Sequence, residues 1–129
     1  MYTPYTLTKM EELEKILKRN DAESTLILDV LRALTVFGGS LWLSELGDAI
    51  SRVRLGETGY VFDEKAVLKA LKKLSSLGVV SLEEKVRASD KASGEKDFLI
   101  RLVLEEARRL LLGDSVINNY YSSIAKQGF

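Results

Sequence analysis

One stretch decides the fold of this 129-residue chain: residues 67–80, which read VLKALKKLSSLGVV. Apolar residues recur there every three or four positions, which predicts a helix over residues 64–77 that Asp63 caps. Gly78 supplies the left-handed residue that ends such a helix. After it the apolar period falls from that of a helix to that of a strand, so residues 79–87 are predicted to form a strand.

The sequence before this stretch predicts further helices and one short strand. Thr8 and Glu11 have the spacing of a capping box, and Ser44 is in the position of a second helix cap. Gly38 and Gly39 end an apolar helical stripe, and two glycines close together predict a loop. The expected elements are helices over residues 8–19, 21–37 and 45–52, a strand over 40–43 and a loop over 55–60.

The sequence after it returns to a strand and then to helices. Alternating apolar residues predict a strand that pairs with the one after Gly78, and the polar segment between the two is predicted to be a long hairpin loop. Gly113 separates two amphipathic segments, each with helical spacing. The expected elements are a loop over residues 88–97, a strand over 98–103 and helices over 105–112 and 115–126.

From residue 21 onward, this order of elements resembles the winged helix-turn-helix family of prokaryotic and archaeal transcriptional regulators. Residues 41–50 (LWLSELGDAI) resemble the small strand and support helix of that family. Residues 67–80 resemble its recognition helix and the turn into its wing. The resemblance covers residues 21–109 and implies an α+β fold, mainly α-helical with a small β-hairpin wing.

The chain departs from the family between the support and recognition helices. The family has a turn of a few residues there, whereas residues 53–62 intervene in this sequence. Either the support helix extends further or the loop is an insertion. We expect one domain over residues 1–129, in which an N-terminal helix (8–19) and a C-terminal helical tail (115–126) are added to the winged-helix core.

Composition excludes most enzyme classes. The chain has no Cys and no His, so it lacks thiolate ligands, disulfides and the usual general base of hydrolysis. We find no phosphate-binding glycine loop, no GxGxxG motif and no paired carboxylates in an apolar setting. The adjacent Glu83 and Glu84 point to opposite faces of a strand and cannot form a metal pair. We therefore expect a protein that is not an enzyme and has no cofactor or metal.

The sequence also predicts a cytoplasmic protein without membrane association. Its start does not have the pattern of a signal peptide, and charged residues interrupt every apolar run well before about 20 residues. The 19 basic and 19 acidic residues cancel overall. Along the chain, however, residues 1–51 carry five basic and eight acidic residues, and residues 52–101 carry eleven basic and eight acidic residues. The positive excess coincides with the predicted recognition helix and wing.

The resemblance implies binding of double-stranded DNA by a homodimer that pairs through its terminal helices and regulates transcription. Basic and hydroxyl side chains on the recognition helix, the support helix and the wing are the candidates for phosphate and base contacts. The recognition helix has no Arg, Asn or Gln, the usual base readers. The candidate DNA-binding residues are Lys65, Lys69, Lys72, Lys73, Ser76, Arg52, Arg54, Lys91 and Lys96.

Other interpretations stay open. The lysine face is also typical of an ordinary solvated helix, and zero net charge favours a winged helix that serves as a protein-interaction module of a transcription or replication assembly. A ligand-sensing regulator is a third possibility. Trp42 is expected to pack in the core. Tyr120, Tyr121 and Phe129 either pack on their own domain or form a dimer seam.

Overall fold

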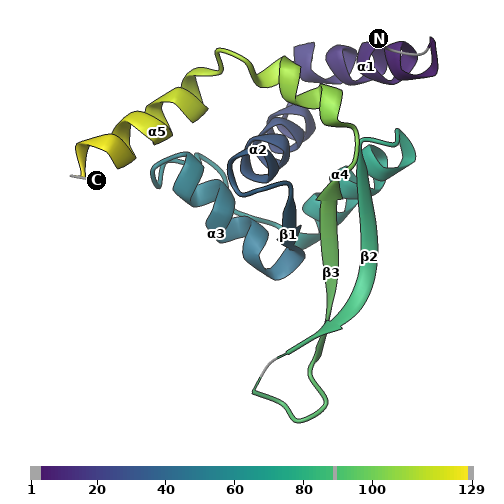
Figure 1. The fold of residues 1–129 in the computed structure, drawn as a ribbon, viewed down its shortest axis with the longest axis vertical. Coiled ribbons are helices and arrows are strands. Elements are labelled where there is room, and N and C mark those ends of the chain that lie inside the picture. The colour runs from purple at the N-terminus through teal and green to yellow at the C-terminus, as the bar shows by residue number, and fades with distance from the viewer. Residues whose placement is uncertain (1–3, 89, 128–129) are drawn as a thin grey trace.

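The computed structural model describes residues 4–88 and 90–127 and has an α+β fold. The described residues form six helices, one of them a 3₁₀ helix, and three short strands (Figure 1). In chain order they are α1 (Pro4–Lys18), α2 (Ala22–Val36), β1 (Ser40–Trp42), α3 (Leu43–Val53), α4 (Glu64–Ser76), β2 (Val80–Arg87), β3 (Glu95–Leu102), η1 (Glu105–Leu111) and α5 (Ser115–Lys126).

Helix α2 is the centre of the packing. It contacts α1, α3, α4, β3 and η1, and most of its apolar side chains are fully buried. One hydrophobic cluster includes side chains from every helix and from β2 and β3, from Met10 in α1 to Ile117 in α5. The stripe predicted for residues 64–77 is confirmed, because Val67, Ala70, Leu71 and Leu74 of α4 are all buried in this cluster.

The sheet is antiparallel with the strand order β1-β3-β2. In its register, Trp42 of β1 lies opposite Leu99, and Val80 of β2 lies opposite Leu102. The far part of the β2–β3 hairpin projects beyond the helices, while α5 extends from the opposite side of the body (Figure 1). Trp42, expected in the core, is only half-buried because it is the residue before α3.

Two predicted helix starts are wrong. Helix α1 begins at Pro4, so Thr8 lies inside it and does not cap it; proline is favoured in a first turn, where its missing N–H has no partner to lose. Helix α3 begins at Leu43, so Ser44 is also inside a helix. The Ser44 hydroxyl instead donates to Asp97 Oδ2 at 2.5 Å, and this hydrogen bond joins α3 to β3 in place of a local cap.

Two boundaries differ in the second half of the chain. Strand β3 begins at Glu95, not at residue 98, because pairing with Arg87 continues the ladder into the polar segment. Lys96 therefore lies in a strand and not in the loop. The segment predicted as a helix over 105–112 is the 3₁₀ helix η1, whose N-cap residue, Leu104, makes no capping side-chain hydrogen bond.

The long connection between α3 and α4 is a loop. Helix α3 ends at Val53 and α4 begins at Glu64. Leu55, Gly56 and Gly59 have positive φ values of 56°, 83° and 71°, which a helix cannot contain. The alternative of a longer support helix is therefore wrong.

Candidate nucleic-acid interface

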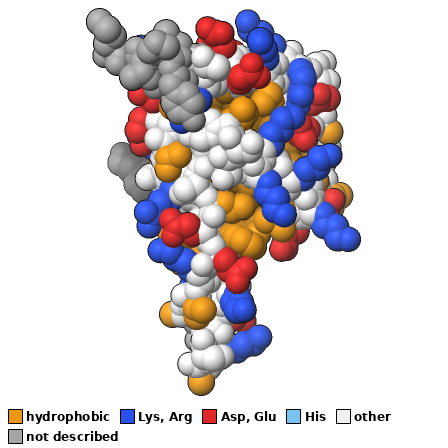
Figure 2. Space-filling model, turned by 90° about the vertical axis from the view of Figure 1, so that its right-hand side faces the viewer, with side chains coloured by type: hydrophobic (Ala, Val, Ile, Leu, Met, Phe, Trp, Pro, Cys, Tyr) orange, Lys and Arg blue, Asp and Glu red, His pale blue; other side chains and the backbone are white. Residues whose placement is uncertain are grey.

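Helix α4 presents lysines directly opposite its buried stripe. Its N-cap, Asp63, accepts a hydrogen bond from the Lys65 N–H at 3.2 Å, and this orients the first turn. The exposed face is formed by Lys65, Lys69, Lys72 and Ser76. Among the described residues, Lys65, Lys69 and Lys72 have no ion-pair partner. Figure 2 shows basic side chains gathered over the body of the molecule on this side.

Lys73, predicted with this group, is turned away from it. Its Nζ lies 2.8 Å from Glu23 Oε1 of α2, and its side chain is half-buried. The hydrogen bond from Lys73, together with one from Arg19, lowers the pKa of the Glu23 carboxyl. Lys73 thus connects α4 to α2, and the free lysine face has three members.

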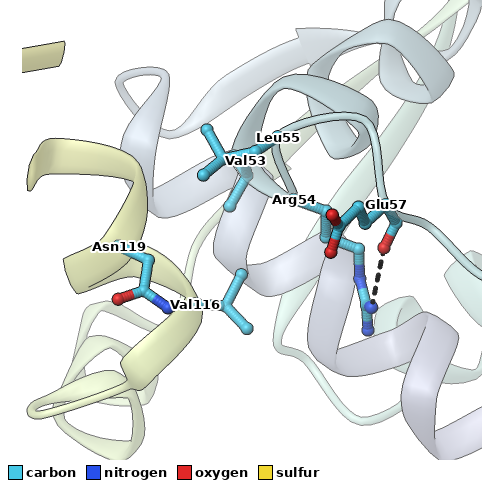
Figure 3. A pocket seen from close by; sticks show the side chains of 6 residues that line it. All are labelled: Val53, Arg54, Leu55, Glu57, Val116 and Asn119. Atoms are coloured by element: carbon cyan, nitrogen blue, oxygen red, sulfur yellow. Dashed lines mark hydrogen bonds between the residues drawn. The ribbon is translucent and has the colours of Figure 1, made fainter. Parts of the chain in front are cut away.

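The two candidate arginines of the support helix have different surroundings. Arg52 is exposed in the last turn of α3 and borders a hollow of about 340 Å³ that also contains Glu45 and Asp48. Arg54 is half-buried and is directed inward to the carboxylate of Asp29. In Figure 3 its side chain extends away from α5, and its guanidinium donates to the Glu57 carbonyl at 3.5 Å. Arg54 is therefore engaged within the protein.

Asp29 is the centre of a buried polar cluster that the sequence analysis missed. It is 1% exposed. Arg54 Nε donates to its two carboxylate oxygens at 2.9 and 2.8 Å, Arg32 Nη1 donates at 3.0 Å and the Tyr60 hydroxyl at 2.5 Å. Burial and the hydrogen bond to Asp29 raise the pKa of Tyr60 far above its usual value. Arg32 also donates to Asp114, the N-cap of α5, at 3.0 and 2.8 Å.

A signal for this cluster is present in the sequence. Asp29 and Arg32 are three positions apart within the apolar stripe of α2, where charged side chains are rare unless they are paired. The other partners, Arg54, Tyr60 and Asp114, are 25 to 82 positions away and have no local pattern.

The hairpin carries its candidate lysines beside carboxylates. Lys91, in the turn, lies 3.6 Å from Glu95, and Lys96 in β3 lies 4.0 Å from Glu84. All these side chains are well exposed, so the pairs are weak. The region from β2 to β3 contains five basic and five acidic residues, so its net charge is zero. Both blue and red side chains lie on the protruding hairpin in Figure 2.

Asp97 anchors the base of the hairpin to α3. It is 9% exposed and accepts hydrogen bonds from the Ser44 hydroxyl, from Arg87 Nε at 2.9 Å and from the Phe98 N–H at 2.8 Å. Burial raises the pKa of this carboxyl, but these hydrogen bonds outweigh it, and the net pKa is lowered. Local sequence does not predict this role of Asp97, because its partner Ser44 lies 53 positions away.

The C-terminal helix lies on the end of α3. Ile117 is buried, and Tyr120 makes an edge contact with Phe37 at 6.1 Å between ring centroids. Tyr121 is 51% exposed. A shallow pocket of about 210 Å³, lined by Val53 and Val116 among others, separates α5 from the α3–α4 loop (Figure 3). Phe129, assigned to the same group by sequence, lies outside the described residues.

The described residues contain neither a metal-site cluster nor a membrane-spanning helix. No group of three or more His, Cys, Asp or Glu side chains in residues 4–88 and 90–127 has the arrangement of a metal site. No helix in those residues is both long enough and apolar enough to cross a bilayer. No protein-family model matches the sequence, and no curated protein matches it.

Proposed function

We propose that residues 21–109 form a winged helix and that the protein binds double-stranded DNA through α4. Three observations support the winged-helix assignment: the element order from α2 to β3, the antiparallel sheet with β1 beside β3, and the position of α4 before the hairpin. In this proposal α4 is the recognition helix, α3 the support helix and the β2–β3 hairpin the wing.

The free lysine face of α4 carries the proposal. Lys65, Lys69 and Lys72 project from the side opposite the core, and no described carboxylate pairs with them. Three unneutralised ammonium groups on one helix face suit the phosphates of a duplex. Ser76 completes the face and supplies a hydroxyl donor. Because the face lacks Arg, Asn and Gln, most of its binding free energy comes from the backbone of the DNA and little from base edges.

Charge reversal tests the proposal. Anisotropy titration of a labelled 20-base-pair duplex at low salt should give binding whose log K falls with log [salt] with a slope of about −3, for about three lysine–phosphate contacts. The Lys69→Glu/Lys72→Glu variant should bind at least about 100-fold more weakly. Lys15→Glu/Lys18→Glu on α1 makes the same change in net charge elsewhere and should retain most of the affinity. Absence of binding by the wild-type protein at low salt would refute the function.

The proposal includes a homodimer that regulates transcription. Helix α5 supports it, since this helix extends from the body and leaves Tyr121 half exposed. A dimer brings two α4 helices to half-sites about 34 Å apart, one turn of the duplex. Sedimentation equilibrium of the wild type and of Tyr121→Glu tests the seam: a wild-type monomer at micromolar concentration contradicts it.

A protein-interaction module is the second candidate. The neutral hairpin favours it, as do exposed apolar side chains such as Val61 (91%), in the loop before α4, and Val86 (62%), on the hairpin. A protein partner would be retained at salt concentrations that release DNA, because apolar contacts are strengthened and not screened by salt.

A further inference from the structure

The loop between α3 and α4 needs an anchor outside itself. It contains three residues with positive φ, two of them glycines, so its backbone has high conformational entropy when it is not held. Within the loop, Thr58 Oγ1 donates to the Tyr60 carbonyl at 3.3 Å. Near its end the Phe62 ring covers Gly47 of α3, where a Cβ atom would lie 3.4 Å from the ring. The hydrogen bonds that join this loop to the buried polar cluster come from its first and middle parts.

Both parts of the loop are hydrogen-bonded to the carboxylate of Asp29. Arg54, the C-cap of α3, donates from Nε to both Asp29 oxygens, and its guanidinium carbon lies 5.9 Å from the Tyr60 ring centroid. Tyr60, four residues before α4, donates its hydroxyl to the same carboxylate. One buried acid on α2 therefore holds the loop at its start and at its middle, and these two points define the path by which the chain enters α4.

We propose that Asp29 is the positioning residue of the lysine face, which it orients through Arg54 and Tyr60 without touching DNA. This inference rests on the proposed function, in which α4 meets the duplex. The family has a short turn at this place, whose length alone restricts the angle between the two helices. The connection is longer in this chain, and here the Asp29 cluster restricts the angle between α3 and α4. Arg32 and Asp114 tie α5 to the same carboxylate, so the proposed dimer helix and the proposed DNA helix share one buried anchor.

Removing the charge of Asp29 distinguishes a positioning role from a purely electrostatic effect, because the two predict opposite changes in DNA affinity. Replacing Asp29 with Asn removes one negative charge, and simple electrostatics then predicts tighter binding of DNA. A positioning role predicts the opposite, because the amide accepts fewer hydrogen bonds from the two arginines and the loop is released. Tyr60→Phe removes only the hydroxyl donor and leaves the charge, the ring and both arginine contacts in place, so it keeps the test available if Asp29→Asn does not fold.

The experiment measures duplex affinity and amide hydrogen exchange for the wild type, Asp29→Asn and Tyr60→Phe, at a temperature where each is fully folded. We expect duplex binding to weaken about 10-fold for Asp29→Asn and about 3-fold for Tyr60→Phe. Exchange should accelerate in residues 54–66 and stay at the wild-type rate in the hairpin. Thr35→Val likewise removes one hydroxyl, from a residue of α2 whose buried Oγ1 has no hydrogen-bond partner among the described residues, and should leave the affinity and the exchange of that loop unchanged.

Two results would overturn the inference. The first is a folded Asp29→Asn or Tyr60→Phe protein that binds DNA as tightly as the wild type or more tightly. The second is faster exchange spread evenly over the whole chain, which is the pattern of a global stabiliser. The exchange measurement needs no DNA. If the wild type fails to bind DNA, the proposed function fails, while local loosening of residues 54–66 still establishes Asp29 as the residue that positions α4.

Discussion

Helix α4 and the β2–β3 hairpin carry similar numbers of basic side chains and differ in what surrounds them. Four of the five basic residues of the hairpin region lie within 4.0 Å of a carboxylate in the same hairpin. Of the four lysines of α4, Lys73 alone has a described carboxylate partner, and that partner is on α2. The exposed pairs of the hairpin are individually weak, but their opposite charges largely cancel its field at distances larger than the separation within each pair.

The difference shows that a count of lysines does not locate an anion-binding surface. The excess of three positive charges over residues 52–101 equals the net charge of α4 itself. The hairpin contributes no excess. If both regions meet DNA, α4 supplies the electrostatic attraction, and the hairpin contributes shape and individual hydrogen bonds.

The largest expected effect compares the two regions by the same triple charge reversal. Lys65→Glu/Lys69→Glu/Lys72→Glu should lower duplex affinity by about 1,000-fold at low salt, since it replaces three attractions with three repulsions. Lys85→Glu/Lys91→Glu/Lys96→Glu makes the same change in net charge on the hairpin and should lower affinity by about 10-fold. Fluorescence anisotropy measures both. Equal losses would show that the hairpin is as important electrostatically as α4.

The next effect concerns how the hairpin is held. Asp97→Ala removes the acceptor of Ser44, Arg87 and a backbone N–H, and should lower the free energy of unfolding by about 1–3 kcal/mol. Because the hydrogen bonds and ion pair described for Asp97 join it to α3 and to the hairpin, and not to α4, duplex affinity of the folded variant should change by less than about 3-fold. Urea denaturation and anisotropy test the two parts separately. A loss of affinity as large as that of the α4 triple variant would mean that the hairpin has to be held in place for binding.

Stability should also fall in acid, partly through Asp97. The folded-state pKa of Asp97 is lower than the usual value for an aspartate, and the pKa values of Asp21 and Glu23 are likewise lower than usual for their side chains. A lowered carboxyl pKa contributes stability above the unfolded-state pKa, and that contribution is lost as pH falls through the folded-state pKa. The free energy of unfolding should therefore decline from about pH 5 downward. Asp97→Asn should show a shallower decline; an unchanged slope would remove Asp97 from the acid response.

Periodicity predicts the fold well where each element is decided by its own residues. The stripe of Val67, Leu71 and Leu74 specifies α4 and its buried face, and the change of period after Gly78 specifies β2. The prediction fails where a residue far away in the sequence determines the contacts of a side chain. Ser44 has the local chemistry of a helix cap, but the carboxylate of Asp97, 53 positions away, accepts its hydroxyl.

The candidate site follows the same division. The exposed face of Lys65, Lys69 and Lys72 is predictable, because helical spacing places it opposite the leucines. The engagement of Arg54 is not, because its partner, Asp29, lies 25 positions earlier and only the packing of α3 on α2 brings them together. Lys73 is intermediate: its position at the edge of the buried stripe is periodic, whereas its pairing with Glu23 depends on the packing of α2 against α4.

The smallest expected effects distinguish two neighbours on α4. Lys72→Gln removes a free lysine, so it should weaken duplex binding by about 3- to 5-fold, one phosphate contact, and leave the free energy of unfolding unchanged. Lys73→Gln removes the partner of Glu23, whose side chain is 28% exposed, and should lower the free energy of unfolding by at most about 1 kcal/mol with little change in binding. Both variants have the same charge and the same new side chain one position apart. Net charge therefore cannot explain a difference between them, and equal losses of affinity would mean that duplex DNA draws Lys73 away from Glu23 and that the DNA-binding face of α4 has four lysines.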